Sequence, residues 1–463
     1  MVAYQPPDPV LLMIGATFRL ESLRAAALRL HPLVREDSAA LARFGLPVEA
    51  AQSLASDAAE LGRMDLGFTQ LAALYAVSWV ALPFNLLERA GLAGMEGWLA
   101  FSALGLIACS LFTLYEASGS AIAGAPQEYV QRQALYGLVG IIGMIAVSRI
   151  DYSRFRELRV GIYTFLCASI FAVFTFGVAA RGSTNSLELP FFTFQPAELG
   201  KLLLVLALAG FVIDGARRGS EGQRTIRILC LGLVPTGLVL LQDLGTSLVF
   251  AAITFAIMVA AGVRWSHLAM IGVALAVFVA FVLVALPAAG HPVLKEYQQE
   301  RLTSFLSPSS DIGDAGYQQN QAKVGIGAGG TTGRGNQATQ SRFGFVPERH
   351  TDFIFAVVAE RYGFMGAALV LSLFALLFWR ALRLMTLSKN FYGTLVAAGI
   401  AAAIIFQVFV NVGMNLGIMP ITGIPLPLMS YGGSAIISTF LMIGVLQSIH
   451  IESHAGQRSQ WID

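Results

Sequence analysis

The chain has 463 residues, of which 56% are hydrophobic and only 13% are charged. Soluble domains carry about 25% charged residues, so this composition excludes an ordinary soluble protein and indicates one that crosses a membrane several times. The formal net charge of +2 is near balance and gives no indication of nucleic-acid binding. The three cysteines lie in apolar runs without metal-ligand spacing, which predicts small hydrophobic side chains and no disulfide framework.

The N-terminal part of the chain differs from the rest. Residues 1–66 mix arginines, acidic residues and alanines at roughly helical spacing with leucine, which predicts an N-terminal cytoplasmic-type extension. Two alternatives stay open for it, an amphipathic helix on the membrane surface or a small helical unit packed on itself. Residues 67–94 contain an apolar stretch with Pro83 and Asn85, which fits an extra span or a re-entrant helix. No cleavable signal peptide is expected, since no basic start precedes an apolar core.

Residues 95–452 are predicted to form an all-α membrane core of about ten transmembrane helices, because a bilayer-spanning helix needs about 20 mainly apolar residues. The candidate spans, in chain order, are Trp98–Leu114, Leu135–Val147, Val160–Ala179, Leu199–Val212, Ile226–Leu241, Gly245–Ala261, Leu268–Leu286, Phe353–Leu382, Phe391–Met414 and Ala435–Ile449. A short tail, residues 453–463, follows the last of them.

The placement of basic residues predicts the orientation of this core. They follow the second, fourth, sixth and eighth spans, which share one side of the membrane if the spans alternate. The residues concerned are Arg149, Arg154, Arg156, Arg159, Arg217, Arg218, Arg224, Arg227, Arg264, Arg380, Arg383 and Lys389. By the positive-inside rule this side faces the cytoplasm, so residues 288–352 form a large extracytoplasmic loop and the tail lies inside.

The most polar part of that loop, Ser304–Asp352, lies between two long apolar runs. It is rich in glycine and carries charges of both signs, so it is predicted to be a functional loop and not a disordered one. Its stretch GIGAGGTTGRG lacks the Gly-Lys-Ser/Thr ending of a phosphate-binding loop, and nucleotide binding is therefore not expected.

Polar side chains gather at the predicted outer ends of the spans, where such groups are functional candidates by default. They are Gln195, Glu198 and Lys201 at the fourth span, Asp243 before the sixth, Gln321, Lys323, Glu348, Arg349, His350 and Asp352 in the loop, and Ser430 in the Pro- and Gly-rich segment Asn415–Ser434. Glu198 and Lys201 are three residues apart, which predicts an ion pair on one helix face. Two interpretations stay open: the groups line one outward cavity, or they lock helices together.

Five segments of the chain resemble, in order, the signature segments of the SEDS family (shape, elongation, division and sporulation). They are FQPAELGK, DLGTS, GYQQNQAKVGIGAGG, PERHTDFIFAVVAE and PITGIPLPLMSYGGS. The resemblance runs from Glu96 to the last span. Within the family, ERHTDFIF, the lysine of QAKVGIG and ITGIPLP are closer to the rod-shape elongation member, RodA, than to the division member, FtsW.

The resemblance implies a peptidoglycan glycosyltransferase of the bacterial cytoplasmic (inner) membrane. Such an enzyme polymerises lipid II into glycan strands during elongation or division and so controls cell shape, and its partner is a class B penicillin-binding protein that crosslinks the strands. The resemblance assigns the catalytic carboxylate to Asp311, with Asp314 as second choice. This carboxylate would take the proton of the acceptor 4-hydroxyl, while Lys201, Arg349 and Lys323 stabilise the diphosphate leaving group. No tightly bound cofactor is expected, and a divalent cation, Mg²⁺ or Mn²⁺, is an alternative source of positive charge.

The chain departs from the family pattern at several positions. Asn185 and Ser186 stand where the family usually has Arg-Trp, the segment before Asp243 lacks the usual proline, and Ile312 replaces the proline of Asp-Pro. Two other functions stay open: a lipid II flippase or transporter, and a non-catalytic scaffold for a penicillin-binding protein. The lack of an internal repeat and the clustering of polar groups at one face favour chemistry at the membrane surface.

Overall fold

The computed structural model describes residues 95–118, 126–176, 178–180, 183–188, 193–215, 220–280, 314–342 and 348–459. All of them belong to one compact unit, Gly94–Asp463. The predicted N-terminal extension, the predicted extra membrane helix and most of the large loop before Asp314 lie outside the described residues.

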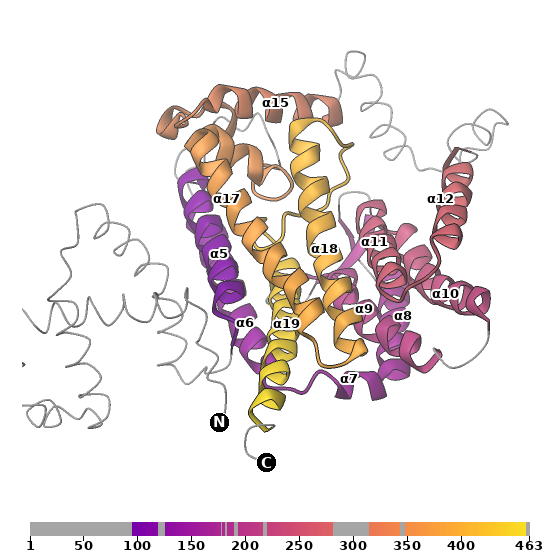
Figure 1. Ribbon diagram of the computed structural model, residues 1–463. Coiled ribbons are helices and arrows are strands. Elements are labelled where there is room, and N and C mark those ends of the chain that lie inside the picture. The colour runs from indigo at the N-terminus through magenta and orange to yellow at the C-terminus, as the bar shows by residue number, and fades with distance from the viewer. Residues whose placement is uncertain are drawn as a thin grey trace, which may run out of the picture. The chain divides into compact units, whose positions relative to one another are not determined.

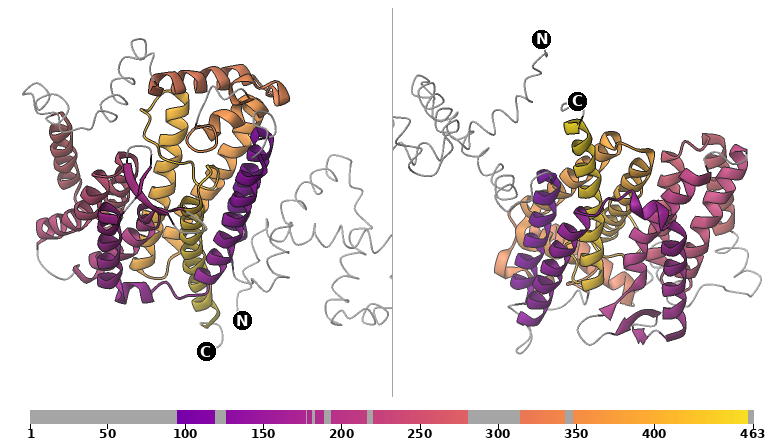
Figure 2. Two further views of the ribbon diagram at one scale, coloured as in Figure 1. Left: turned by 180° about the vertical axis from the view of Figure 1, so that it is seen from behind. Right: turned by 90° about the horizontal axis from the view of Figure 1, so that it is seen from below.

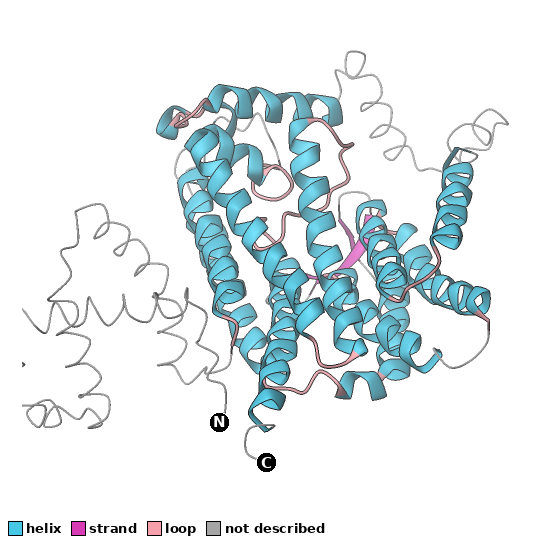
Figure 3. Cartoon of the chain, in the orientation of Figure 1, coloured by secondary structure: helices cyan, strands magenta, loops and turns pink. Residues whose placement is uncertain are grey.

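The described chain is almost wholly helical, as Figure 3 shows. Seven of its helices are long and apolar enough to cross a membrane: α5 (Gly97–Ser118), α6 (Pro126–Ser148), α9 (Pro196–Gly215), α10 (Glu221–Leu240), α17 (Ile354–Leu387), α18 (Phe391–Leu416) and α19 (Gly433–Ser459). Three shorter apolar helices occupy the remaining predicted spans: α8 (Arg159–Phe176), α11 (Leu244–Ala260) and α12 (Trp265–Ala280). The predicted all-α membrane bundle of about ten helices is therefore confirmed.

Two groups of helices flank a central pair (Figure 1). Helices α5, α6, α17 and α19 pack together on one side, and α8, α10, α11 and α12 form the other, with α9 and α18 between them. The views in Figure 2 show the same division. Helices α6 and α19 approach closely because Gly444 lies against the backbone of Met144, where a Cβ atom would come within 2.7 Å of the Met144 oxygen.

The connection between α8 and α9 is not a plain loop. The predicted third span ends early, at Phe176, and is followed by three short antiparallel strands in the order β1 (Val178–Ala180), β2 (Ser183–Glu188) and β3 (Thr193–Phe194). The atypical pair Asn185-Ser186 lies in β2, and Ser186 is the partner of Val178. A four-residue helix, α7 (Arg154–Glu157), joins α6 to α8.

The predicted large loop contains a helix that the glycine-rich sequence did not suggest. Helix α15 (Asp314–Gly329) lies across the ends of α17 and α18 (Figures 1 and 2). It buries Ala322 in a small second core with Phe353, Ala356, Met414 and Ile421, separate from the main core of the bundle. A 3-10 turn, η2 (Gly335–Gln337), and a four-residue helix, α16 (Thr339–Arg342), follow α15. The end of the loop is thereby fixed to the membrane helices.

Glycines that follow α15, such as Gly333, allow the backbone there to pack closely against a kink in α17. At Gly363 the backbone adopts φ 63° and ψ −158°, which breaks α17 into two helical parts. A Cβ atom at Gly363 would overlap the backbone of Gly333, and one at Gly333 would overlap the carbonyl of Arg361. The two backbones are joined by hydrogen bonds, such as the one from the Phe364 amide to the Gly330 oxygen at 2.9 Å. Only glycine fits such close contact between two backbones.

Candidate active site

The segments that carry the predicted polar groups meet at one end of the bundle, which we call the α15 end. It comprises α15, the turn 348–353 before α17, the segment 417–432 between α18 and α19, and the first turns of α9 and α11. The predicted catalytic residue, Asp311, lies outside the described residues, and so does the side chain of Asp314. The predicted outward cavity stays a prediction, because residues 281–313 and 343–347, which adjoin these segments in the sequence, lie outside the described residues.

Glu198 and Lys201 form the predicted ion pair in the first turns of α9. The Lys201 Nζ lies 2.6 Å from Glu198 Oε2, and the two side chains are 1% and 3% exposed. The same turn is joined to α19, because the Ser438 hydroxyl donates to the Glu198 carbonyl at 2.6 Å and the Gln195 amide donates to Ser434 Oγ at 3.0 Å. The pairing is confirmed, and it places an ion pair deep among the helices.

Asp243 caps the N-terminus of α11. Its carboxylate accepts hydrogen bonds from the Gly245 amide at 2.9 Å and from the Thr246 hydroxyl at 2.6 Å. The pKa of Asp243 is raised, mainly by burial and also by the nearby Glu198 carboxylate. These hydrogen bonds oppose the rise. Gly245 lies against the carbonyl of Thr422, so the start of α11 also touches segment 417–432.

The turn 348–353 is held by its own side chains and by α18. The Thr351 hydroxyl donates to Glu348 Oε2 at 2.7 Å. The carbonyl of Asp352 accepts from Asn411 Nδ2 at 2.9 Å and from Asn415 Nδ2 at 3.2 Å. Both asparagines are fully buried, and Asn415 Oδ1 also accepts from the Ala356 amide at 3.1 Å. The turn therefore has little freedom to move relative to α18.

Ser430 joins segment 417–432 to the same turn. Its hydroxyl donates to the Thr351 carbonyl at 2.6 Å and accepts from the Leu426 amide at 2.7 Å. The Tyr431 amide donates to the His350 carbonyl at 2.8 Å, and Gln133 Nε2 donates to the Ser430 carbonyl at 3.2 Å. The prediction that this proline-rich segment is non-helical is confirmed, and protein groups satisfy its backbone, as a non-helical segment within a membrane requires.

Arg349 and His350 form a buried basic pair. Arg349 is 7% exposed, and its Nε–H donates to His350 Nε2 at 3.2 Å, so the imidazole proton lies on Nδ1. That Nδ1 is buried and has no partner among the described residues. Burial and the charge of Arg349 lower the pKa of His350 to about 4. The ring stacks on Tyr129, with centroids 5.0 Å apart. His350 is therefore neutral near pH 7.

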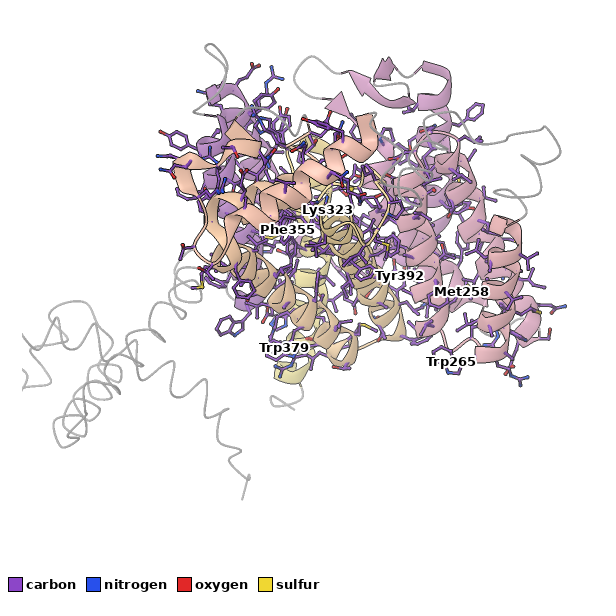
Figure 4. The ribbon with its side chains drawn as sticks, turned by 90° about the horizontal axis from the view of Figure 1, so that it is seen from above. Met258, Trp265, Lys323, Phe355, Trp379 and Tyr392 are labelled. Carbon is purple, nitrogen blue, oxygen red and sulfur yellow. The ribbon has the colours of Figure 1, made fainter. Side chains whose placement is uncertain are left out.

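Three side chains of α15 face different surroundings. Gln319 is buried and donates to the carbonyls of Met414 at 3.0 Å and Met419 at 2.9 Å, which anchors the helix to α18. Gln321 is half-buried. Lys323, labelled in Figure 4, is half-buried against Gly417, and it forms no ion pair with any of the described residues. Lys323 is thus a cation of the α15 end whose charge no described carboxylate neutralises.

A second arginine of this end, Arg361, was not predicted from the sequence. Arg361 is 2% exposed at its side chain and forms an ion pair with Glu116 of α5 at 3.0 Å. The pKa of Arg349 is lowered by burial and by the charge of Arg361, so the two guanidinium groups share one region. Asn411, Asn415 and Gln319 were missed as well. The signal that could have found most of them is a charged or amide side chain within an apolar span.

A resident metal ion has no evident ligands in the part of the chain that the structure describes. No group of three or more His, Cys, Asp and Glu side chains comes together in those ranges. Carboxylate, carbonyl and water oxygens are the usual ligands of Mg²⁺ and Mn²⁺, so the described residues, which bring no such cluster of carboxylates together, do not fit such a site.

Comparison with known proteins identifies the family. The family model described as "Cell cycle protein" (FtsW, RodA, SpoVE) matches residues 97–455. The chain is 35% identical over 349 residues to the peptidoglycan glycosyltransferase MrdB of Escherichia coli K12, covering 75% of this chain and 91% of that protein. It is 33% identical over 328 residues to stage V sporulation protein E of Bacillus subtilis 168, covering 69% of this chain and 86% of that protein.

Solved structures share the fold. One, described as the structural coordination of polymerization and crosslinking by a peptidoglycan synthase complex, matches with a TM-score of 0.66 at 31% identity, covering 78% of this chain and 98% of that one. The rod shape determining protein RodA of Thermus thermophilus matches with a TM-score of 0.57 at 28% identity, covering 77% of this chain and 96% of that one. With its helical membrane core and its signature segments gathered at one end, the chain belongs to the SEDS family, together with RodA, FtsW and stage V sporulation protein E.

Proposed function

We propose that this chain polymerises lipid II into glycan strands, as a peptidoglycan glycosyltransferase whose active site is the α15 end. One observation carries the proposal: the α15 end gathers the cations Arg349, Arg361 and Lys323, and Asp311 stands three residues before α15 in the sequence. Relatives that match most of the chain are named peptidoglycan glycosyltransferases. A leaving diphosphate develops negative charge, and fixed cations stabilise it in the transition state.

The described contacts assign different roles to these cations. Lys201 and Arg361 each have a carboxylate partner, Glu198 and Glu116, so their charges are largely balanced. Lys323 has no such partner among the described residues and is only half-buried, which makes it the best candidate to contact the diphosphate directly. Arg349, buried in the turn 348–353, adds positive potential at the same end.

The reaction needs a base for the acceptor sugar. In our proposal the Asp311 carboxylate takes the proton of the acceptor 4-hydroxyl as the oxygen bonds to the anomeric carbon of the donor. The bond from that carbon to the phosphate oxygen breaks, and undecaprenyl diphosphate leaves with the bonding electrons. His350 is a poor candidate for this base, because its imidazole is buried and its Nε2 accepts from Arg349.

The chain is an integral membrane protein, and we propose that the α15 end faces out of the bacterial cytoplasmic membrane. The opposite end carries Arg156 and Arg159, which pair with Asp214, and Arg264, which pairs with Glu221. An excess of basic residues at one end favours the cytoplasm for that end. We also propose a class B penicillin-binding protein as partner, since the similar solved structure is described as a synthase complex that coordinates polymerization and crosslinking.

A gel assay with labelled lipid II tests this function. Purified wild type, with and without a class B penicillin-binding protein, should produce a ladder of glycan strands. Asp311→Asn should lower the rate by about 100-fold or more, as expected for loss of a general base. Lys323→Ala should lower it less, whereas Asp314→Asn serves as the matched control and should retain the ladder. Full activity of Asp311→Asn would refute the assignment.

The same material separates the two rival functions. A flippase would move labelled lipid II across vesicle membranes without joining it, and the movement would not depend on Asp311. A scaffold would support growth of cells that carry Asp311→Asn, provided that the partner is present. Either outcome, together with no ladder from the wild type, would replace the proposed polymerase activity.

A further inference from the structure

The end of the bundle opposite α15 contains a pocket that the proposed reaction does not use. It lies where α9 ends, α10 begins, α11 ends and α18 begins, with Gly215, Glu221, Gly262 and Phe391 among its lining residues. Helix α18 runs from Phe391 at this pocket to Leu416 near α15. The two ends are therefore separated by the length of a membrane helix, roughly 1.5 Å per residue.

Three arginines line this pocket: Arg224, Arg227 and Arg264. Arg264 is neutralised, because its Nε forms an ion pair with Glu221. Neither Arg224 nor Arg227 forms an ion pair with any residue in the described ranges. Two guanidinium groups thus line one small space whose described carboxylate, Glu221, is already paired with Arg264, which favours an anion as the ligand of the pocket. Guanidinium groups bind phosphate oxygens in a bidentate manner.

Apart from Glu221 and Thr225, the rest of the pocket lining is apolar. Its floor includes Phe211, Val212, Ile228 and Leu231, which come from facing sides of α9 and α10. The hydroxyl of Thr225 is already engaged with the Glu221 carbonyl at 3.0 Å and with His267 at 3.0 Å, so it offers little to a ligand. A small hydrated anion would gain nothing from such a floor, whereas a molecule with a phosphate and an apolar part would fit both features.

The surroundings favour a lipid as that molecule. Trp265, next to Arg264, has a side chain that is 75% exposed, and exposed tryptophans in membrane proteins lie at the level of the lipid headgroups. Further along α10, Leu233 and Val234 are 54% and 52% exposed and extend the apolar surface away from the arginines. A phosphate held at the pocket would thus have an acyl path beside it on the same helix.

We propose that this pocket binds the phosphate of an anionic phospholipid, with Arg224 and Arg227 as its ligands and the acyl chain lying along α10. The lipid would fill the junction of α9, α10, α11 and α18. It would thereby hold α10 and α11 against the central pair, α9 and α18. If the proposed orientation is right, it comes from the cytoplasmic leaflet.

The test compares thermal unfolding of the full chain in detergent with added lipids. Phosphatidylglycerol should raise the unfolding temperature of the wild type more than phosphatidylcholine does, and native mass spectrometry should show retained phosphatidylglycerol. The variant Arg224→Gln/Arg227→Gln should lose that preference. The matched control Arg154→Gln/Arg383→Gln removes two exposed basic residues from the same end and should keep it.

Two results would overturn the proposal. If the Arg224/Arg227 variant retains the wild-type preference for phosphatidylglycerol, the pocket is not the lipid site. If soluble glycerol phosphate protects the wild type as well as phosphatidylglycerol does, the site binds a free phosphate and no lipid. These readouts do not involve glycan synthesis, so they are independent of the assigned polymerase activity.

Discussion

The two ends of the helix bundle use polar residues in opposite ways. At the α15 end they are buried and bind backbone: Gln319, Asn415 and Ser430 all donate hydrogen bonds to carbonyl groups of non-adjacent segments. At the end opposite α15 the ion pairs lie near the surface, as in Arg264–Glu221, whose side chains are 67% and 46% exposed. Amide and hydroxyl groups thus hold an irregular backbone in place at one end, while charged side chains remain exposed at the other.

One buried ion pair at the end opposite α15 is an exception to this contrast. Glu96 and Arg380 pair with side chains only 3% and 12% exposed, and Gln447 bonds the backbone of Glu96 through both its amide atoms. This cluster joins the start of α5 to α17 and α19. Burial of charge in this protein therefore accompanies contacts between helices, at whichever end they occur.

The largest expected effect comes from breaking the buried pair at the α15 end. Lys201→Met leaves the Glu198 carboxylate buried without its partner, and removal of one partner from such a pair costs about 3–5 kcal/mol. Denaturation titrations in detergent should show this loss. The double variant Glu198→Gln/Lys201→Met should recover much of it, and the exposed control Arg264→Met should change stability by no more than about 1 kcal/mol. Equal effects of Lys201→Met and Arg264→Met would invalidate the contrast between the two ends.

The next effect concerns the kink in α17. Gly363→Ala places a side chain at φ 63°, which costs about 1–3 kcal/mol, and the added Cβ overlaps the backbone of Gly333 and Thr331. We expect lower thermal stability and faster hydrogen exchange in residues 329–334. Gly161→Ala in α8 is the matched control, because no atom lies within 4 Å of its Cβ position and alanine favours a helix. A stable Gly363→Ala variant would mean that α15 does not depend on the kink.

A smaller effect follows from loss of one buried amide. Asn415→Leu removes the acceptor of the Ala356 amide and one of the two donors to the Asp352 carbonyl, and the one buried amide left unsatisfied costs about 1–3 kcal/mol. Hydrogen exchange of residues 348–356 should accelerate and glycan synthesis should fall with it. Gln321→Leu, a half-buried position of α15, should leave this exchange unchanged. Unaltered exchange in Asn415→Leu would show that Asn411 alone suffices to hold the turn.

The effect that is smallest at neutral pH is a pH dependence due to His350. Its pKa is about 4 in the folded protein, below its ordinary value of 6.5, so the unfolded chain binds this proton first. The free energy of unfolding does not depend on His350 above pH 6.5, where the imidazole is neutral in both states. It falls as the pH drops from 6.5 toward 4, by at most about 1.4 kcal/mol per pH unit. Thermal unfolding between pH 7 and pH 4 should show a shallower slope for His350→Gln than for the wild type. Identical slopes would argue that His350 takes up its proton before the protein unfolds.

What could be predicted from the sequence depends on the range of the contacts involved. The spans and the Glu198–Lys201 pair follow from local periodicity, and the proline-rich segment was correctly predicted to be non-helical. Helix α15 was not foreseen, because its glycines resemble a loop until α17 lies against them. The contacts of Arg361 with Glu116 and of Asn415 with Asp352 join residues 245 and 63 positions apart, which no local pattern reveals. The departure Asn185-Ser186 likewise gave no indication of the strand in which it lies.

The kink at Gly363 also divides α17 into a long part after the kink and a short part before it. Residues 364–387 alone exceed the roughly 20 residues that a bilayer requires, so the turns before the kink are not needed to span it. They carry Arg361 and the turn 348–353, and they are continuous with a helix whose depth the membrane itself determines. We expect the thickness of the bilayer to govern how far these turns, with the buried Arg361, project from the membrane.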